Sequence, residues 1–314
     1  MAKAGTEARS TLLKGLIFAT PLLAGFVAME CGLRRVITRA SHARELIETQ
    51  RARCQVLILG ASNAKDGIAV EALTEPAVNV ADNAQSLYYD VAIADRYVPG
   101  MPQLKVVILP LTYVTFETES YDWEGWTSWP FYADYWGIPS QTPTFFDAQR
   151  WSLTARYGVR MSISYARKGF RVNSLPTSAP KALSGEASTA EAARLAKEHG
   201  KAIHPERVWD NLARLDHLAA LVERRGAAFA LVDMPTQASY LRLLSSSVVA
   251  RNARNRNEFL QRHPNVIYRD YVHDPRFVAE DFRDPVHLSP QGAQKFTRII
   301  DFELVRPASA QVRH

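Results

Sequence analysis

The stretch "VLILGASNAKDGI", Val56–Ile68, contains the pattern from which the fold can be worked out. A run of β-forming residues stops at Gly60, and Ser62 follows two residues later. This pattern predicts a strand, a tight turn and the start of a helix. Two roles are open to Ser62: its hydroxyl can cap the helix, or it can act as a nucleophile at the carboxyl edge of a sheet, where helix N-terminal amides steady an oxyanion.

Short apolar runs like this one recur along the chain, separated by helical or irregular stretches. The runs at 56–60, 105–111 and 227–235 are continuously apolar, as expected of strands covered on both faces. Helical patterns lie between them, and one ends at Gly226, a residue suited to a helix C-terminus. Strands that alternate with helices predict an α/β fold with a parallel, doubly wound sheet, which binds ligands beyond the carboxyl ends of its strands. The predicted strands are residues 56–60, 77–82, 105–111, 227–235 and 265–271.

The N-terminal segment is a candidate membrane anchor. Residues Leu16 to Met29 carry no charge, and with their flanks they form a helix of about twenty residues, enough to span a bilayer. No clean small-x-small cleavage site follows, and Glu30 stands where a lipoprotein would need a small residue before Cys31, so an uncleaved anchor is favoured over a signal peptide, a lipoprotein or a buried core helix. We expect an anchor at 1–35, a polar linker helix at 36–53 and an α/β domain at 54–314.

The orientation of the anchor follows less directly. Basic residues precede the span and also follow it, so the positive-inside rule does not decide between the two orientations. The favoured arrangement has the N-terminus inside and the large domain outside the cytoplasmic membrane, in the periplasm or an equivalent extracytoplasmic space.

The overall composition excludes several classes of protein. The net charge is +6, but the arginines are scattered and no dense basic run stands out, so nucleic acid is not expected as a partner. Cys31 and Cys54 have no metal-site spacing around them, and a disulfide between them is not indicated. We expect neither a metal nor a cofactor.

Two stretches of sequence are not accounted for by the alternating strands and helices of the predicted α/β fold. Residues of about 170–205 are rich in Ser, Ala and Pro and predict a flexible, exposed segment with a short helix. Residues of about 117–165 are an aromatic-rich insertion, whose rings either form a core of their own or, where exposed, stack on sugars. The insertion holds five of the six tryptophans, Trp123, Trp126, Trp129, Trp136 and Trp151.

The stretch "DPVHLSPQG", Asp284–Gly292, supplies what a nucleophilic Ser62 would need. A serine nucleophile requires a base, and the base requires an orienting carboxylate. With two intervening residues in a turn, Asp284 can contact one nitrogen of the His287 ring while the other nitrogen faces a serine. The alternative is a surface histidine beside an aspartate that only stabilises the turn.

Together, the Gly-x-Ser after the first strand and the Asp-x-x-His before the last helix resemble the SGNH/GDSL hydrolase superfamily, over residues of about 54–304. The resemblance implies a flavodoxin-like, three-layer sandwich of about five parallel strands. It also implies that Ser62 is the nucleophile, His287 the base and Asp284 the residue that orients the base. The family's oxyanion-hole glycine is replaced in "NVADNAQSLYYD", and its oxyanion-hole asparagine is missing from "LPLTYVTFE". The oxyanion donors expected here are therefore Ser62, Asn83, Ala84 and Thr112.

The membrane anchor, the "NVADNAQSL" block and the fourth strand ending in "DMPTQASYLR" resemble one branch of the superfamily, the exported proteins of alginate and cellulose O-acetylation and of teichoic acid D-alanylation. The branch implies acyl transfer or ester hydrolysis on an extracytoplasmic polysaccharide or another acylated substrate, beside a membrane-bound O-acyltransferase partner. Whether the acceptor is a sugar hydroxyl or water stays open. The alternative is a membrane-anchored scaffold that binds glycan without catalysis. The substrate-binding candidates are Asn63, Trp123, Trp126 and Trp129.

Overall fold

The computed structural model describes residues 2–123, 129–142, 146–171 and 189–311. It divides into two compact units, one of residues 1–39 and 141–175, the other of residues 40–140 and 176–314. Each unit is described by itself.

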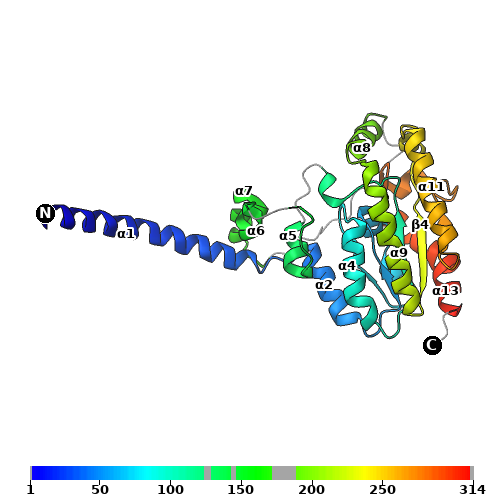
Figure 1. The fold of residues 1–314 in the computed structure, drawn as a ribbon, viewed down its shortest axis with the longest axis horizontal. Helices are drawn as coiled ribbons and strands as arrows, with labels where there is room; N and C mark the ends of the chain where they lie inside the picture. Colours follow the sequence, from blue (N-terminus) through cyan, green and yellow to red (C-terminus); the bar gives the residue numbers. More distant parts are fainter. Residues whose placement is uncertain (1, 124–128, 143–145, 172–188, 312–314) are drawn as a thin grey trace. The chain divides into compact units, whose positions relative to one another are not determined.

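The larger unit is built on a parallel sheet of five strands in the order β2-β1-β3-β4-β5, which confirms the predicted α/β fold (Figure 1). All neighbouring strands are parallel; Leu57, for example, pairs with Val78 on one side and Val107 on the other. Each strand lies within one of the five predicted runs. The strands are β1 (Val56–Ile58), β2 (Ala77–Asn79), β3 (Val106–Leu111), β4 (Ala228–Asp233) and β5 (Ile267–Asp270).

Continuously apolar strands make sense because each face of the sheet is covered. Along β1 and the residue after it, Leu57 and Leu59 belong to one core cluster, whereas Val56 and Ile58 belong to the cluster on the opposite face. The first face packs against α2 (Arg39–Gln50), α4 (Leu87–Tyr97), α9 (Val208–Arg224) and α11 (Ser246–Arg262). The second face packs against α3 (Ser62–Gly67), α12 (Pro290–Ile300) and α13 (Arg306–Gln311).

The strand order places a crevice at the carboxyl end of β1. The chain leaves β1 for β2 on one side and later returns to β3 on the other, so the connections diverge at this point. Such a switch point is where open α/β sheets bind ligands. Ser62 follows β1 and therefore lies at the switch point. Helices α8 (Thr189–Lys201) and α10 (Ala238–Leu241) pack together, and a two-stranded antiparallel hairpin, β6 (Phe282–Asp284) and β7 (His287–Leu288), precedes α12.

The described residues of the smaller unit form a long N-terminal helix and two further helices. Helix α1 (Ala2–Leu33) packs against α7 (Leu153–Arg167), which follows α6 (Ala148–Trp151). Within α1, residues Leu13–Leu33 are long and apolar enough to cross a membrane, and 11% of their most apolar window is buried. This agrees with the predicted apolar anchor. Cys31 and Cys54 are both free thiols.

Short helices occur within the aromatic-rich stretch: a 3₁₀ turn at Ser120–Asp122, α5 (Trp129–Phe131) and a π-helical turn at Tyr132–Trp136. Tyr132 and Trp136 are buried in the main core, whereas the side chain of Trp151 is mostly exposed. The aromatic residues therefore divide between core and surface. The expected division of the chain at residues 35 and 53 stays a prediction.

Candidate active site

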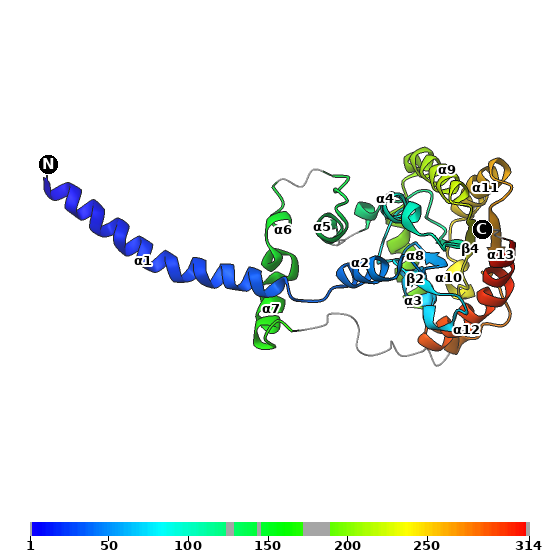
Figure 2. The ribbon, with the colours of Figure 1, turned by 90° about the horizontal axis from the view of Figure 1, so that it is seen from below.

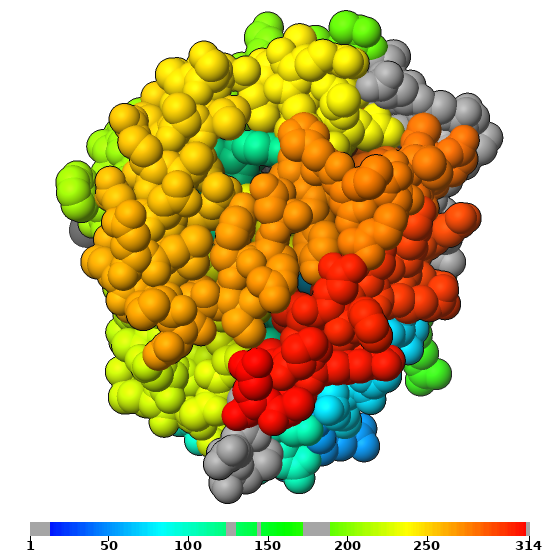
Figure 3. Space-filling model, turned by 90° about the vertical axis from the view of Figure 1, so that its right-hand side faces the viewer, coloured from blue at the N-terminus to red at the C-terminus, as the bar shows by residue number. Residues whose placement is uncertain are grey.

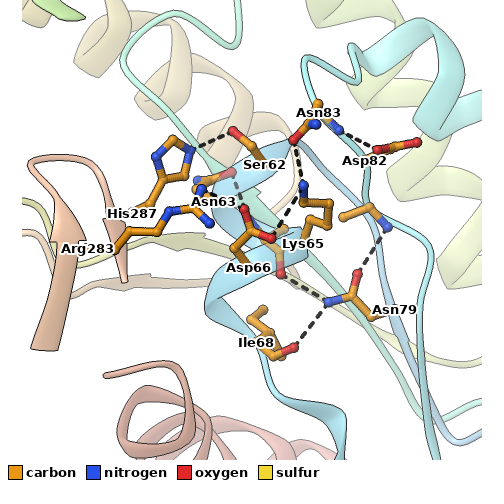
Figure 4. A network of polar contacts seen from close by, with 12 residues as sticks. Ser62, Asn63, Lys65, Asp66, Ile68, Asn79, Asp82, Asn83, Arg283 and His287 are labelled. Carbon is orange, nitrogen blue, oxygen red and sulfur yellow. Dashed lines mark hydrogen bonds and ion pairs between the residues drawn. The ribbon is translucent and has the colours of Figure 1, made fainter. Parts of the chain in front are cut away.

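Ser62 is presented by the sharp turn between β1 and α3. Gly60 has φ +112°, a conformation that L side chains rarely adopt, and its N–H donates to Asp90 Oδ1 at 2.8 Å. Ser62 is the first residue of α3, while Ala61 is the N-cap, so the helix-cap role considered for Ser62 is wrong. Its hydroxyl instead lies 2.8 Å from Nε2 of His287 (Figure 4).

His287 and Asp284 face each other across the end of the β6–β7 hairpin. Both carboxylate oxygens of Asp284 approach Nδ1 of His287, at 3.0 and 2.9 Å. Oδ1 also accepts the backbone N–H groups of Val286 and His287, at 3.0 and 2.9 Å. The backbone of the turn thus fixes the position of the Asp284 carboxylate independently of the His287 ring. The structure brings Asp284, His287 and Ser62 into one hydrogen-bonded row.

The rest of the "HLSPQG" stretch holds this hairpin against the sheet. Leu288 is buried in the second core cluster, and Ser289 caps α12 by accepting the N–H of Gly292 at 3.2 Å. A Cβ at Gly292 would lie 1.9 Å from the backbone oxygen of Asp281, so only glycine lets the helix approach the hairpin this closely. Each of these residues has a structural reason for its place in the motif.

The electrostatics of the row favour an ionised Asp284 at neutral pH. Burial alone would raise its pKa, but the hydrogen bond and charge of His287, the N–H of Val286 and the charge of Arg283 together lower the pKa to about 2. An ionised Asp284 accepts the Nδ1–H of His287, which leaves Nε2 to accept the proton of the Ser62 hydroxyl. This is the arrangement of a serine nucleophile with its base.

Backbone N–H groups suitable for an oxyanion lie beside Ser62. Ala84, in the position where a glycine was expected, has φ +48°, so the left-handed conformation is retained without the glycine. Within the described ranges, no hydrogen bond engages the N–H groups of Ser62 and Ala84. Both residues line the same cavity. They are the predicted donors left available by this geometry.

The other two predicted donors are engaged. The N–H of Asn83 donates to Asp82 Oδ1 at 2.7 Å. The side-chain oxygen of Asn83 accepts a hydrogen bond from Lys65 Nζ, also at 2.7 Å (Figure 4). The N–H and hydroxyl of Thr112 both contact the hydroxyl of Thr115, at 2.8 and 3.0 Å. For Asn83, the side-chain nitrogen is the end left to donate.

A cavity of about 730 Å³ opens over Ser62 and His287. Figure 3 shows the surface hollowed between the yellow α10–α11 segment and the orange segment after β5, with the teal segment after β3 at the bottom. Trp123 lines the cavity, as does Asn63, which is buried and accepts the N–H of Ala64 at 2.9 Å. Trp126 lies outside the described residues, and Trp129 begins α5.

A second histidine lies in the cavity wall. Nδ1 of His199 lies 2.5 Å from the hydroxyl of Tyr240, and its ring meets the edge of Trp123 with centroids 5.2 Å apart. Burial, together with the charge of His287, lowers the pKa of His199 to about 4, so this ring is neutral at neutral pH. An uncharged cluster of Trp123, His199 and Tyr240 therefore lines this part of the cavity wall.

Sequence reasoning did not find Asp90 or His199. Asp90 accepts from Gly60 and, at 2.6 Å, from Gln85, and it is the acidic member of the otherwise apolar buried stripe of α4. A charge on an apolar stripe is a signal that a sequence can carry. His199 falls in a Ser/Ala-rich stretch without such a signal. Among the described residues, no cluster of three His, Cys, Asp or Glu side chains is placed to hold a metal ion.

Comparisons with known proteins place the chain only distantly. No protein-family model matches it. No curated protein matches it either. Among solved structures, it is similar to a Streptococcus pneumonia protein provisionally described as a platelet activating factor, with 11% identity and a TM-score of 0.40, over 91% of this chain and 98% of that one. A similarity this weak carries no functional information, so the function must be argued from the geometry of the site.

Proposed function

We propose that this protein is a membrane-anchored acyltransferase or esterase of the SGNH type, acting through an acyl-Ser62 intermediate on an extracytoplasmic saccharide. One observation carries the proposal: the Ser62 hydroxyl, both His287 nitrogens and the Asp284 carboxylate form a continuous hydrogen-bonded row at a cavity of about 730 Å³. A surface histidine with a turn aspartate would have no reason to point at a serine on another element.

The proposed reaction has two half-steps. Nε2 of His287 takes the proton from Ser62 as the Ser62 oxygen attacks the acyl carbonyl, and the N–H groups of Ser62 and Ala84 donate hydrogen bonds to the oxyanion of the tetrahedral intermediate. The intermediate collapses when His287 returns the proton to the leaving oxygen, which leaves an ester on Ser62. His287 then deprotonates the acceptor, a sugar hydroxyl or water, which attacks this ester, and His287 returns the proton to the Ser62 oxygen as the acyl–oxygen bond breaks.

The acceptor is proposed from the cavity wall. Trp123 offers an aromatic surface beside His199 and Tyr240, and aromatic faces pack well on the C–H faces of sugars. A membrane-bound O-acyltransferase that supplies or receives the acyl group remains the expected partner.

A serine-directed phosphonate tests the nucleophile directly. We expect intact-mass spectrometry of the full-length protein to show one added phosphonyl group in the wild type and none in Ser62→Ala. Ser86→Ala is the matched control, because Ser86 lines the same cavity but its hydroxyl is buried without a hydrogen-bond partner in the described chain. It should be labelled like the wild type.

The same experiment separates the two functional classes. An unlabelled wild type, with Ser86→Ala equally unlabelled, would reject the enzyme and leave the glycan-binding scaffold. If the phosphonate labels, acetyl release or transfer on candidate polysaccharides, wild type against Ser62→Ala, identifies the substrate and distinguishes esterase from transferase.

A further inference from the structure

The small unit exposes several large apolar side chains. Val159, Met161 and Ile163 of α7 are 67%, 46% and 41% exposed. Gly158, with φ +72°, kinks α7 ahead of them. Trp151, at the end of α6, is 66% exposed. Large apolar side chains gathered on one short element indicate a surface made for contact.

This surface is fixed to the end of the candidate membrane span. Glu30 of α1 accepts the Ser152 hydroxyl at 2.7 Å and the N–H groups of Leu153 and Thr154 at 2.8 and 3.0 Å. The carboxylate therefore satisfies the first N–H groups of α7, which have no partner within their own helix. Apolar contacts reinforce this junction through a buried cluster of Leu33, Val36, Leu153 and Tyr165.

The geometry of the junction defines the depth of α7. Figures 1 and 2 show α7 running across the C-terminal end of α1 rather than alongside it. Residues Leu13–Leu33 make a helix roughly 30 Å long, about the thickness of the hydrocarbon core. If α1 crosses the bilayer, the crossing helix lies near the plane of the membrane, at the level where the span emerges.

The charges of this segment match a membrane surface. Residues 148–171 contain five arginines, one lysine and no acidic residue. Arg160, Arg167, Lys168 and Arg171 are exposed and form no ion pair with any described residue. Near an anionic surface, each such residue is attracted to the lipid headgroups. Apolar side chains beside unpaired basic ones characterise helices that lie in the bilayer interface.

We propose that α6 and α7 form an interfacial helix that docks on the anionic headgroups of the leaflet from which α1 emerges. Val159 and Ile163, four residues apart, share one edge of α7 beside its buried, α1-facing stripe, and would enter the acyl boundary. Arg160 and Arg167 lie next to that edge and would meet the phosphates. The proposal rests on α1 crossing the membrane and is independent of the chemistry of Ser62.

Depth-dependent fluorescence quenching of the full-length protein in lipid nanodiscs tests this docking. In a Cys31→Ser background, with Cys54 buried, a nitrobenzoxadiazole label is placed at Ile163→Cys, at Leu23→Cys inside the span, or at Lys197→Cys on exposed α8. In discs containing phosphatidylglycerol, we expect the Ile163 label to be quenched at least about twofold more by shallow spin-labelled lipids than by deep ones. The Leu23 label should show the reverse, and the Lys197 label little quenching.

The role of charge is tested in the same discs. Replacing Arg160, Arg167 and Lys168 by Gln should lower the shallow quenching at Ile163 to the level seen in pure phosphatidylcholine discs, while the Leu23 label stays deep.

Several outcomes would overturn the docking. A deep Leu23 label together with a water-exposed Ile163 label would support the membrane span but reject the docking of α7 in the bilayer interface. Equal quenching at Ile163 and Lys197 would show that the label itself partitions. A blue shift at Ile163 that depends on the number of chains per disc, without shallow quenching, would identify a second copy as the occupant instead. A water-exposed Leu23 label would reject span and docking together, and none of these results would bear on phosphonate labelling of Ser62.

Discussion

At the scale of single residues, the candidate site depends on a carboxylate that stays ionised. Asp284 has a pKa of about 2 because its contacts with His287, Val286 and Arg283 outweigh its burial. Asp284→Asn removes the charge and can present an N–H to Nδ1, which favours the wrong ring tautomer. We expect the rate of Ser62 phosphonylation at pH 7 to fall roughly 10²–10⁴-fold. Stopped-flow phosphonate labelling measures it; an unchanged rate would remove Asp284 from the mechanism.

Asp90 makes a separate prediction about stability. Its burial raises its pKa to about 7, against the lowering effect of its bonds from Gln85 and Gly60. A carboxyl with a raised folded-state pKa stabilises the fold below its unfolded value near 4, and this stabilisation is lost as pH rises to 7. Asn stays neutral at every pH. The free energy of unfolding of Asp90→Asn, measured by urea unfolding, should therefore rise relative to that of the wild type by up to about 4 kcal/mol between pH 4 and pH 8.

Any pH-independent effect of the Asn side chain on the free energy of unfolding cancels in this comparison, because only the change of stability with pH is measured. Glu258→Gln, on the exposed surface of α11, is the control and should run parallel to the wild type. If the stability of Asp90→Asn changed with pH in parallel with that of the wild type, Asp90 would be ionised and well solvated at neutral pH, contrary to its burial.

Residue types and spacing made Ser62, Asp284 and His287 candidates, because a base and its carboxylate on one turn leave a local pattern, and the family resemblance supplied their expected roles. The donors were harder to predict. Ala84 occupies a left-handed position without being glycine, so composition alone could not show that its N–H would be available. His199 reaches the cavity only because α8 packs on α10, a contact between segments some forty residues apart.

At the scale of elements, the β6–β7 hairpin is the part on which the site is assembled. Its approach to α12 requires Gly292, whose added Cβ would overlap the backbone of Asp281. We expect Gly292→Ala to cost at least about 1–3 kcal/mol in urea unfolding, because a rigid backbone cannot move aside as a flexible side chain would. Phosphonate labelling of Ser62 should also slow, since the hairpin carries His287.

Gly200 provides the matched control. It lies in α8, and a Cβ there would meet nothing within 4 Å. Gly200→Ala should leave the labelling rate unchanged and raise stability by less than about 1 kcal/mol, because Gly200 lies in the last turn of α8. Equal effects of the two substitutions would contradict the close approach of hairpin and helix.

The strands were predictable because burial on both faces of a parallel sheet leaves continuous apolar runs, as in Val106–Leu111. The junction of α7 with α1 was not predictable in this way. It depends on Glu30 satisfying the N–H groups of Leu153 and Thr154, more than 120 residues further along the chain, and no local period records such a contact.

At the scale of the whole molecule, the proposed substrate requires the α/β unit to lie outside the cytoplasmic membrane. Hydropathy predicts the span, and α1 is apolar enough to form one. The side on which the large unit lies is not given by the flanking charges. Lys3 and Arg9 precede the span and Lys14 lies at its start, while Arg34, Arg35 and Arg39 follow it, so basic residues flank both ends and the positive-inside rule does not decide the orientation.

Topology can be measured with a membrane-impermeant maleimide on right-side-out and inverted membrane vesicles. In a Cys31→Ser background, Lys197→Cys on exposed α8 reports the large unit, and Ala4→Cys, ahead of the span, reports the N-terminus. We expect Lys197→Cys to react in right-side-out vesicles and Ala4→Cys only in inverted ones. The opposite pattern would place Ser62 in the cytoplasm, where an extracytoplasmic saccharide cannot reach it. The Ser62 nucleophile would survive that result, but a different acyl acceptor would then be required.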